Sequence, residues 1–204
     1  MYLQSEEIRG LIDKNELIIR PLLDVDAQLG ELTFDFRLGY DFLVSIQGRE
    51  AFIDTSLNNG ENSRIFKNFF HKTRRRPGET ILLHPNQTVL ATSLEYIKLP
   101  KDICLILNTR SSYSRLGLNL STLVQPGYCG SLSFEFTNTN KVPINLTIGS
   151  RIVQGRFAKL NSESNYFKNK RKYLCQVRPI LSAITEDNDL QILNSYWKDL
   201  NHQI

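Results

Sequence analysis

Apolar and β-branched residues gather in short runs along most of this chain, with turn residues between them. Between residues 79 and 160, turn pairs such as Pro85–Asn86 and Pro126–Gly127 help to separate these runs. The runs are Glu79–His84, Thr88–Ser93, Ile103–Leu107, Asn119–Val124, Ser131–Asn138, Ile144–Ile148 and Arg151–Leu160. Many short strands at this spacing predict a mainly β protein, folded as a sandwich or a distorted barrel.

The N-terminal part begins with a helical pattern. Ile8, Leu11 and Ile12 fall on one face of a short helix. Ser5 is a suitable N-cap for this helix, and Asn15 is a suitable end. Runs rich in β-branched and aromatic residues follow, and they predict strands over Glu16–Arg20, Thr33–Leu38 and Asp41–Ile46.

The C-terminal part is more polar and ends in a second helical pattern. Residues 161–172 are polar and basic, which predicts a mobile segment. Apolar residues then recur near helical spacing at Leu190, Leu193, Tyr196, Trp197 and Leu200. No clear linker interrupts the chain, so we predict one domain over residues 1–204, with a core of about residues 1–180 and a tail of about residues 181–204.

The composition is that of an ordinary globular protein. Of the 204 residues, 41% are hydrophobic and 23% are charged, and the formal net charge is +4. This mild positive charge fits a small anionic ligand. The chain start lacks the basic and apolar stretches of a signal peptide, and no apolar run reaches the about 18 residues of a membrane span. We therefore expect a cytoplasmic protein without a membrane partner.

The densest basic run is Lys72–Arg76, directly before the turn pair Pro77–Gly78. Such a run is most simply a solvated loop. It lacks the interleaved aromatic residues on which nucleic-acid bases stack. The run therefore argues against nucleic acid as a partner.

Arg110 and Arg115 bracket a run of hydroxyl side chains that includes Ser111 and Ser112. Guanidinium forks and neutral donors within six residues suit the oxygens of a polyphosphate. A polar turn with its arginines in surface ion pairs would have the same composition. The segment is therefore a candidate phosphate clamp, and the name clamp is kept below for residues 110–115.

A single carboxylate, Glu135, follows the clamp in an alternating strand pattern. Leu132, Phe134 and Phe136 share one face of the predicted strand, and Ser133 and Glu135 belong to the other. A polar face fits the protein surface and a binding pocket equally well. The alternation alone leaves these two interpretations of Glu135 open.

The order of these elements resembles the dCTP deaminase family, within the wider dUTPase-like superfamily. The segments that carry the resemblance are Phe34–Gly39, Ala51–Asp54, Leu83–Pro85, Leu94–Glu95, Leu99–Pro100, Arg110–Leu118, Pro126–Gly130, Ser133–Asn138 and Gly149–Gln154. Their common order covers about 180 residues. The resemblance implies a dUTPase-like distorted β-barrel, or β-clip, with a short N-terminal helix and a C-terminal helix.

The resemblance also implies roles for single residues. It makes Glu135 the catalytic residue, which takes a proton from the attacking water. It assigns substrate binding to Arg110, Ser111, Ser112, Arg115, Gln125, Tyr128, Ser133, Phe134, Tyr166, Lys172 and Gln176. Core-edge packing for Tyr128, and a solvated basic tail for Tyr166, Lys172 and Gln176, are the alternative interpretations.

The chain departs from the family pattern before Pro126. Gln125 stands where the family has an aspartate, and seven residues separate Leu118 from Pro126 where relatives have about ten. A glutamine cannot act as a base. It therefore argues against dUTP hydrolysis, alone or coupled to deamination. The short loop suggests a non-catalytic nucleotide-binding or regulatory role, against which the retained Glu135 argues.

The implied reaction converts dCTP and water to dUTP and ammonia in a homotrimer with sites between subunits. Magnesium is expected to accompany the triphosphate. Zinc-dependent deaminases instead use H-x-E and P-C-x-x-C motifs. The relevant residues here are the dispersed Cys104, Cys129, Cys175, His71, His84 and His202. They form no C-x-x-C and open no H-x-E, so we expect reduced thiols and no catalytic zinc.

Overall fold

A computed structural model of the chain describes residues 1–46, 52–53, 55, 66–168, 171–187 and 189–201. Contacts divide it into two units. The first comprises residues 1–45 and 72–180, and the second comprises residues 46–71 and 181–204. The single domain predicted from the sequence stays a prediction. None of the helices in the described ranges is long and apolar enough to cross a membrane.

The first unit begins with helix α1 (Ser5–Asp13), which buries Ile8 and Ile12. Its N-cap is Gln4, so the prediction of Ser5 as the cap is wrong by one residue. The carboxylate of Glu7 accepts a hydrogen bond from the Gln4 backbone N–H at 2.9 Å, which satisfies a donor at the helix start. Asn15 follows the helix in a left-handed conformation, with φ of 56°, in agreement with its predicted place at the helix end.

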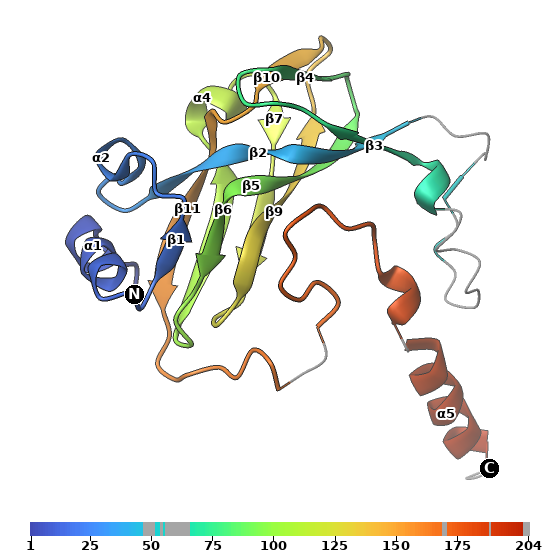
Figure 1. Cartoon of the computed structure of the whole chain (residues 1–204). Helices are drawn as coiled ribbons and strands as arrows, with labels where there is room; N and C mark the ends of the chain where they lie inside the picture. Colours follow the sequence, from blue (N-terminus) through green and yellow to red (C-terminus); the bar gives the residue numbers. More distant parts are fainter. Residues whose placement is uncertain (47–51, 54, 56–65, 169–170, 188, 202–204) are drawn as a thin grey trace. The chain divides into compact units, whose positions relative to one another are not determined.

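One large antiparallel sheet forms the body of the first unit (Figure 1). Its strands are β1 (Ile18–Arg20), β2 (Phe34–Ser45), β3 (Phe70–Arg74), β5 (Thr88–Lys98), β6 (Ile103–Thr109), β7 (Leu118–Asn119), β8 (Ser121–Val124), β9 (Cys129–Asn138) and β11 (Arg151–Lys159). The order is β7-β9-β5-β2-β11-β6-β8, with β1 on β5 and β3 on β2. β4 (Thr80–Leu83) and β10 (Ile144–Thr147) form a separate pair.

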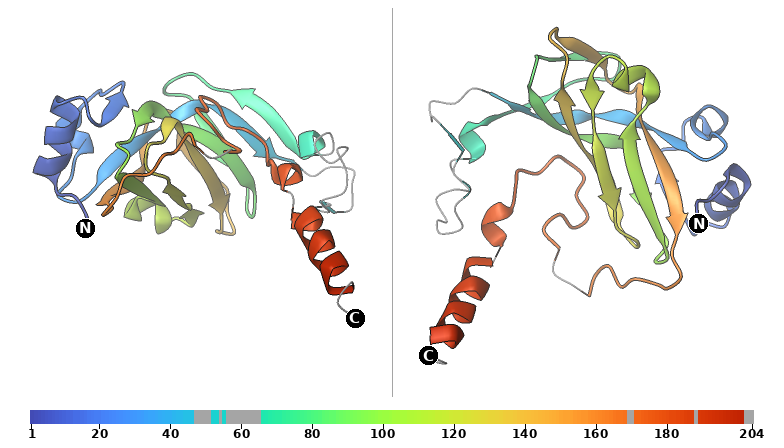
Figure 2. Two further views of the ribbon diagram at one scale, coloured as in Figure 1. Left: turned by 90° about the horizontal axis from the view of Figure 1, so that it is seen from below. Right: turned by 180° about the vertical axis from the view of Figure 1, so that it is seen from behind.

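The strands curve around a common interior, as the left view in Figure 2, seen from below, shows. Six phenylalanines are fully buried there, namely Phe34, Phe36, Phe42, Phe134, Phe136 and Phe157. Each such side chain contributes about 1.5–3 kcal/mol relative to an exposed position. The mainly β, barrel-like fold predicted from the sequence is confirmed.

Two predicted strands join into the single strand β2. The pairing of β2 with β5 shifts register between Leu38 and Phe42, so an irregularity occupies the predicted gap. A Cβ on Gly39 would lie 2.7 Å from the carbonyl oxygen of Thr92. Glycine therefore permits the close approach that lets the strand continue.

Short helices connect the strands. α2 (Val25–Gln28) is capped by Asp24, whose side chain accepts from the Ala27 N–H at 2.9 Å. α4 (Ser111–Ser114) is the helical turn directly after Arg110. The second unit contains η1 (Ile184–Glu186) and α5 (Asp189–Asn201), which confirms the predicted C-terminal helix.

Candidate active site

The clamp follows strand β6 and begins with the turn α4. The hydroxyl-bearing Ser111 and Ser112 are exposed at the start of this turn. Arg115 is exposed as well, and its guanidinium forms no ion pair with a described residue. The clamp therefore presents one whole guanidinium fork and two hydroxyls to a ligand.

The two residues directly after the clamp, Leu116 and Gly117, are anchored to the two residues directly after strand β9. The backbone N–H of Thr139 donates to the Gly117 carbonyl at 2.8 Å. The side-chain amide of Asn140 donates to the Leu116 carbonyl at 3.0 Å. Gly117 has a φ of 89°, and a Cβ there would lie 2.9 Å from the Cβ of Asn140. The clamp thus depends on a glycine and on the strand that carries Glu135.

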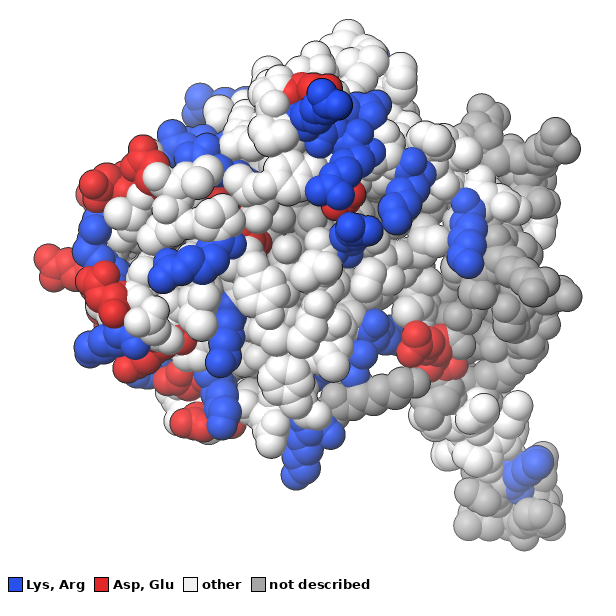
Figure 3. All heavy atoms as spheres, in the orientation of Figure 1, with Lys and Arg blue, Asp and Glu red and all other residues white. Residues whose placement is uncertain are grey.

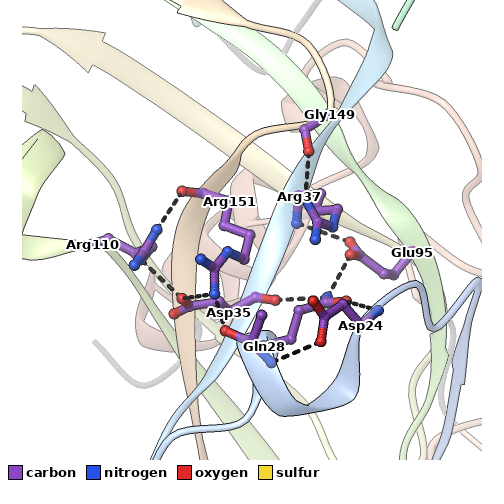
Figure 4. A network of polar contacts seen from close by, with 9 residues as sticks. Asp24, Gln28, Asp35, Arg37, Glu95, Arg110, Gly149 and Arg151 are labelled. Carbon is purple, nitrogen blue, oxygen red and sulfur yellow. Dashed lines mark hydrogen bonds and ion pairs between the residues drawn. The ribbon is translucent and has the colours of Figure 1, made fainter. Parts of the chain in front are cut away.

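Arg110 differs from Arg115 because its guanidinium already binds the protein. Its Nε lies 2.9 Å from Oδ2 of Asp35, and its Nη1 donates to the carbonyl of Arg151 at 3.0 Å (Figure 4). Nη2 is left without a hydrogen bond to a described residue. Arg110 can therefore offer a phosphate only part of its fork.

Asp35 is the anion at the centre of three arginines. Nη1 of Arg151 lies 3.6 Å from the same Oδ2 that binds Arg110. Burial raises the pKa of Asp35 from its ordinary value, and the charges of Arg110, Arg151 and Arg37 oppose this rise. The ion pair with Arg110 fixes the first residue of the clamp on strand β2.

A second carboxylate, Glu95, is fully buried close to Asp35. Its Oε1 accepts from Nε2 of Gln28 at 2.9 Å, and its Oε2 accepts from the backbone N–H of Arg37 at 3.0 Å (Figure 4). Gln28 also donates to the backbone carbonyl of Asp35 at 3.0 Å. Burial raises the pKa of Glu95 to about 7, and the hydrogen bonds and the Arg37 charge lower it only in part.

The sequence analysis assigned no role to Asp35, Glu95 or Arg151. All three lie inside segments that carry the family resemblance. The sequence did contain a signal for Asp35 and Glu95, because each is a carboxylate within an apolar strand sequence. A buried carboxylate needs a hydrogen-bond or ion-pair partner, so these two positions could have been predicted to form polar contacts. The partner residues could not be predicted, because they are far away in the sequence.

Glu135 lies on the polar face of β9, as the alternation predicted. Leu132, Phe134 and Phe136 are fully buried, while Glu135 is exposed. The hydroxyl of Ser133 donates to Oε1 of Glu135 at 3.3 Å. Because the Phe134 side chain belongs to the core, only its backbone could contact a substrate.

Within one chain, Glu135 and the clamp remain separate. Among the described residues, no hydrogen bond or ion pair joins Glu135 to residues 110–115. β6, the strand before the clamp, is separated from β9 in the sheet by β5, β2 and β11, whereas β7, which follows the clamp, pairs with the end of β9. Gln125 is exposed directly after β8.

The predicted binding residues of the C-terminal segment are partly buried against the barrel. Tyr128 donates its hydroxyl proton to the Ser131 carbonyl at 2.6 Å, and Tyr166 packs edge-on against it with ring centroids 5.8 Å apart. The buried Gln176 accepts a hydrogen bond from the Ser131 N–H at 2.8 Å through its backbone carbonyl. Lys172 is exposed. Burial of Tyr128 agrees with core-edge packing, and burial of Tyr166 and Gln176 differs from a fully solvated tail. The mobility predicted for residues 161–172 stays a prediction.

Basic and acidic side chains are mixed over the face drawn in Figure 3. Within the basic run, Arg74 lies 3.9 Å from Asp41 and above the ring of Tyr40, at 5.6 Å from its centroid. These contacts explain part of the run as ordinary surface packing. In the described ranges, no group of three His, Cys, Asp or Glu side chains could hold a metal ion.

Comparisons with known proteins agree with this geometry. A dCTP deaminase from Shewanella amazonensis is 33% identical over 92% of this chain and 100% of that protein. The "dCTP deaminase, dUMP-forming" of Dictyoglomus turgidum is 34% identical over 92% of this chain and 96% of that protein. The crystal structure of 2'-deoxycytidine 5'-triphosphate deaminase from Agrobacterium tumefaciens aligns with a TM-score of 0.57 and 25% identity.

That structural alignment covers 76% of this chain and 47% of the Agrobacterium chain, so this chain spans about half the length of that protein. The family model described as dCTP deaminase-like matches residues 2–160. These residues include the clamp, the Asp35 and Glu95 network, and Glu135 on β9. The chain therefore belongs to the dCTP deaminase-like family.

Proposed function

We propose that this protein deaminates dCTP to dUTP and ammonia in deoxynucleotide metabolism. The observation that carries the proposal is the position of Glu135. It is an exposed carboxylate on the polar face of β9, and the same strand anchors the phosphate clamp at its end. The names of the relatives from Shewanella and Dictyoglomus support dCTP as the substrate.

In this mechanism Glu135 is the general base and then the general acid. Its carboxylate takes a proton from the water whose oxygen bonds to C4 of cytosine. The protonated carboxyl then returns a proton while the C4–N bond breaks and ammonia leaves. Ser133 donates to Oε1, which directs the other carboxylate oxygen toward the water. No cation among the described residues forms an ion pair with Glu135.

The clamp binds the triphosphate. Arg115 supplies a bidentate guanidinium, and Ser111 and Ser112 supply hydroxyl donors. Arg110, which Asp35 holds at 2.9 Å, orients the start of the clamp and adds Nη2. Magnesium forms part of the substrate in this proposal, bound by phosphate oxygens and water.

We further propose that the protein acts as a homotrimer. No hydrogen bond or ion pair joins Glu135 to the clamp within the described chain, so a site built from both can be completed by a neighbouring subunit. Closed symmetry with one repeated interface is the usual arrangement of soluble homo-oligomers. Each site then combines Glu135 of one subunit with the clamp of another.

A second candidate function is conversion of dCTP to dUMP. The name of the Dictyoglomus protein supports it, since that relative is a dUMP-forming deaminase. Gln125, exposed after β8, weighs against it because an amide cannot activate water for phosphate hydrolysis. The exchange Gln125→Asp would restore a carboxylate at this position.

One experiment separates these functions. Pure protein is incubated with dCTP, dUTP and dCMP in the presence of magnesium, and the products are resolved by chromatography and tested for ammonia and pyrophosphate. dUTP with ammonia supports the deaminase, and dUMP with both ammonia and pyrophosphate supports the dUMP-forming enzyme. Tight nucleotide binding without any product would contradict both and favour a regulatory role.

A further inference from the structure

Two cysteines from distant parts of the chain lie side by side at the start of strand β9. The Sγ atoms of Cys129 and Cys175 are 2.9 Å apart, and both residues are free thiols. Cys129 is the first residue of β9, and Cys175 belongs to the segment after the barrel. We infer that Cys129 and Cys175 form a redox-active dithiol, which oxidants convert reversibly to a disulfide.

The backbone around both thiols is already fixed in place. Cys129 pairs with Lys98 in the β9–β5 ladder. The carbonyl of Gln176, next to Cys175, accepts from the Ser131 N–H at 2.8 Å. A disulfide needs a sulfur separation of about 2.05 Å, so the two sulfurs have to approach by only about 0.9 Å.

A glycine makes this close approach possible. Gly130 follows Cys129 with a φ of 145°, and a Cβ there would lie 2.7 Å from the Gln176 carbonyl oxygen. A larger residue would therefore push the segment with Cys175 away from β9. The contact between the two cysteines thus depends on the absence of a side chain at Gly130, and not only on two flexible cysteine side chains.

The pair is open to small oxidants. Cys175 is exposed and Cys129 is half-buried. The third cysteine, Cys104, lies on β6 and has no thiol neighbour in the described chain. In a reducing compartment such pairs rest as thiols and become disulfides under oxidative load, which is the usual role of disulfides there.

The chemistry balances with a peroxide as oxidant. One thiol of the pair loses its proton and attacks one peroxide oxygen, and the hydroxide that leaves takes up this proton, which gives a sulfenic acid and one water. The other thiol then attacks the sulfenic sulfur, the S–S bond forms, and a second water leaves. Two thiols and one hydrogen peroxide yield one disulfide and two waters, and a dithiol reductant reverses the step.

The bond would covalently tie the C-terminal segment to the barrel. Lys172 and Gln176 flank Cys175 closely in the sequence, so their backbone would be held beside β9. The disulfide closes a loop of residues 129–175 and removes open conformations of the unfolded chain. Oxidation should therefore raise the thermal unfolding midpoint, and reduction should lower it again.

The test compares wild type with Cys129→Ser, Cys175→Ser and, as the matched control, Cys104→Ser. Each protein is treated with dilute hydrogen peroxide, its free thiols are counted under denaturing conditions, and its peptides are analysed by mass spectrometry without reduction. We expect wild type to lose two of its three thiols. Cys104→Ser should lose both of its thiols, and one linked peptide pair with Cys129 and Cys175 should appear in both proteins.

The single variants at the pair should form no intramolecular disulfide and show no rise of the unfolding midpoint. Dithiothreitol should restore the wild-type thiols and the lower midpoint. Three free thiols after oxidation, a link that involves Cys104, or a link only between subunits would each overturn the inference. These readouts do not depend on deamination, so a failure of the proposed function leaves this test intact.

Discussion

The two arginines of the clamp differ in what their guanidinium groups already bind. Arg110 is held by Asp35 and by the carbonyl of Arg151, whereas Arg115 is exposed and unpaired among the described residues. From the sequence alone, both arginines have the same predicted role in phosphate binding. The structure assigns orientation of the clamp to Arg110 and leaves Arg115 as the cation available to phosphate.

Exchange of Arg115 for alanine tests this difference. Arg115→Ala should weaken the binding of dCTP and dUTP alike by about 2 kcal/mol, the scale of a charge-assisted hydrogen bond. Isothermal titration calorimetry measures the change. Arg9→Ala, which removes a surface arginine paired with Asp26, is the matched control and should leave affinity unchanged. Equal affinities of Arg115→Ala and wild type would contradict the clamp.

Glu135 is tested by an exchange that preserves its shape. Glu135→Gln removes the proton acceptor and should lower the rate of ammonia release by at least ~100-fold, the usual contribution of a positioned base. Nucleotide affinity should change little, since phosphate contacts are retained. Glu163→Gln, an exposed carboxylate near Lys101, serves as control in the same coupled ammonia assay. A variant with full turnover would exclude Glu135 as the base.

At this scale, the sequence predicted that Glu135 lies on the polar face of its strand, because alternation in one strand is a local property. It also marked Arg110 and Arg115 through their spacing. The ion pair of Arg110 with Asp35 was out of reach, because 75 residues separate the two along the chain and only the sheet order brings them together. Burial of Tyr166 and Gln176 escaped prediction for the same reason.

At the scale of secondary structure, the buried carboxyl of Glu95 joins β5 to β2 and α2. It binds the Arg37 backbone on β2 and the side chain of Gln28 at the end of α2. Since Gln28 also holds the backbone of Asp35, the same contacts support the strand that orients Arg110. The protonation state of one residue therefore affects the packing of three elements.

This arrangement predicts a pH-dependent stability. The pKa of Glu95 is about 7 in the folded chain against an ordinary value of 4.5, so the folded state holds the proton more tightly than the unfolded state. The stabilisation is complete below pH 4.5 and is lost as pH rises through about 7. The free energy of unfolding should fall by about 3 kcal/mol across this window, at about 1.36 kcal/mol per pKa unit.

Urea unfolding followed by circular dichroism over a pH series measures the effect at one protein concentration. Glu95→Gln cannot ionise and should lack this fall, whereas Glu163→Gln should retain it. If wild type and Glu95→Gln show the same slope, the carboxyl of Glu95 does not titrate in this range. The control distinguishes a specific effect from general acid or base sensitivity.

Strand existence was easier to predict than strand length. β6, β9 and β11 appear close to their predicted ranges because apolar runs and turn residues mark them. β5 extends to Lys98, beyond the predicted end at Ser93, and the extension contains the charged Glu95. In this extension, pairing with neighbouring strands outweighed the local sequence pattern, in which the charged Glu95 argues against a strand. The joining of two predicted strands into β2 depended on the backbone approach at Gly39.

At the scale of the whole molecule, the separation of Glu135 from the clamp leads to a prediction about assembly. Light scattering should show a particle of about three times the chain mass of 23.5 kDa. The shared-site model further requires that a Glu135→Gln chain, which lacks turnover, and an Arg115→Ala chain, which binds dCTP weakly, regain activity at low dCTP when they are refolded together, because some mixed sites combine two intact halves. A monomer at micromolar concentration, or no recovery in the mixture, would contradict the shared site.

Strand β9 contains Cys129 at its start and Glu135 along its length, and its end anchors the clamp through Thr139 and Asn140. Because side chains alternate along a strand, insertion of a single residue between Cys129 and Glu135 would either turn Glu135 inward and Phe136 outward together, or move Cys129 to the other face. The positions of Cys129, of Glu135 and of the residues that anchor the clamp thus all depend on the number of residues in β9. Homologues and engineered variants should accept length changes in the loops around β9, while the strand itself should keep its number of residues.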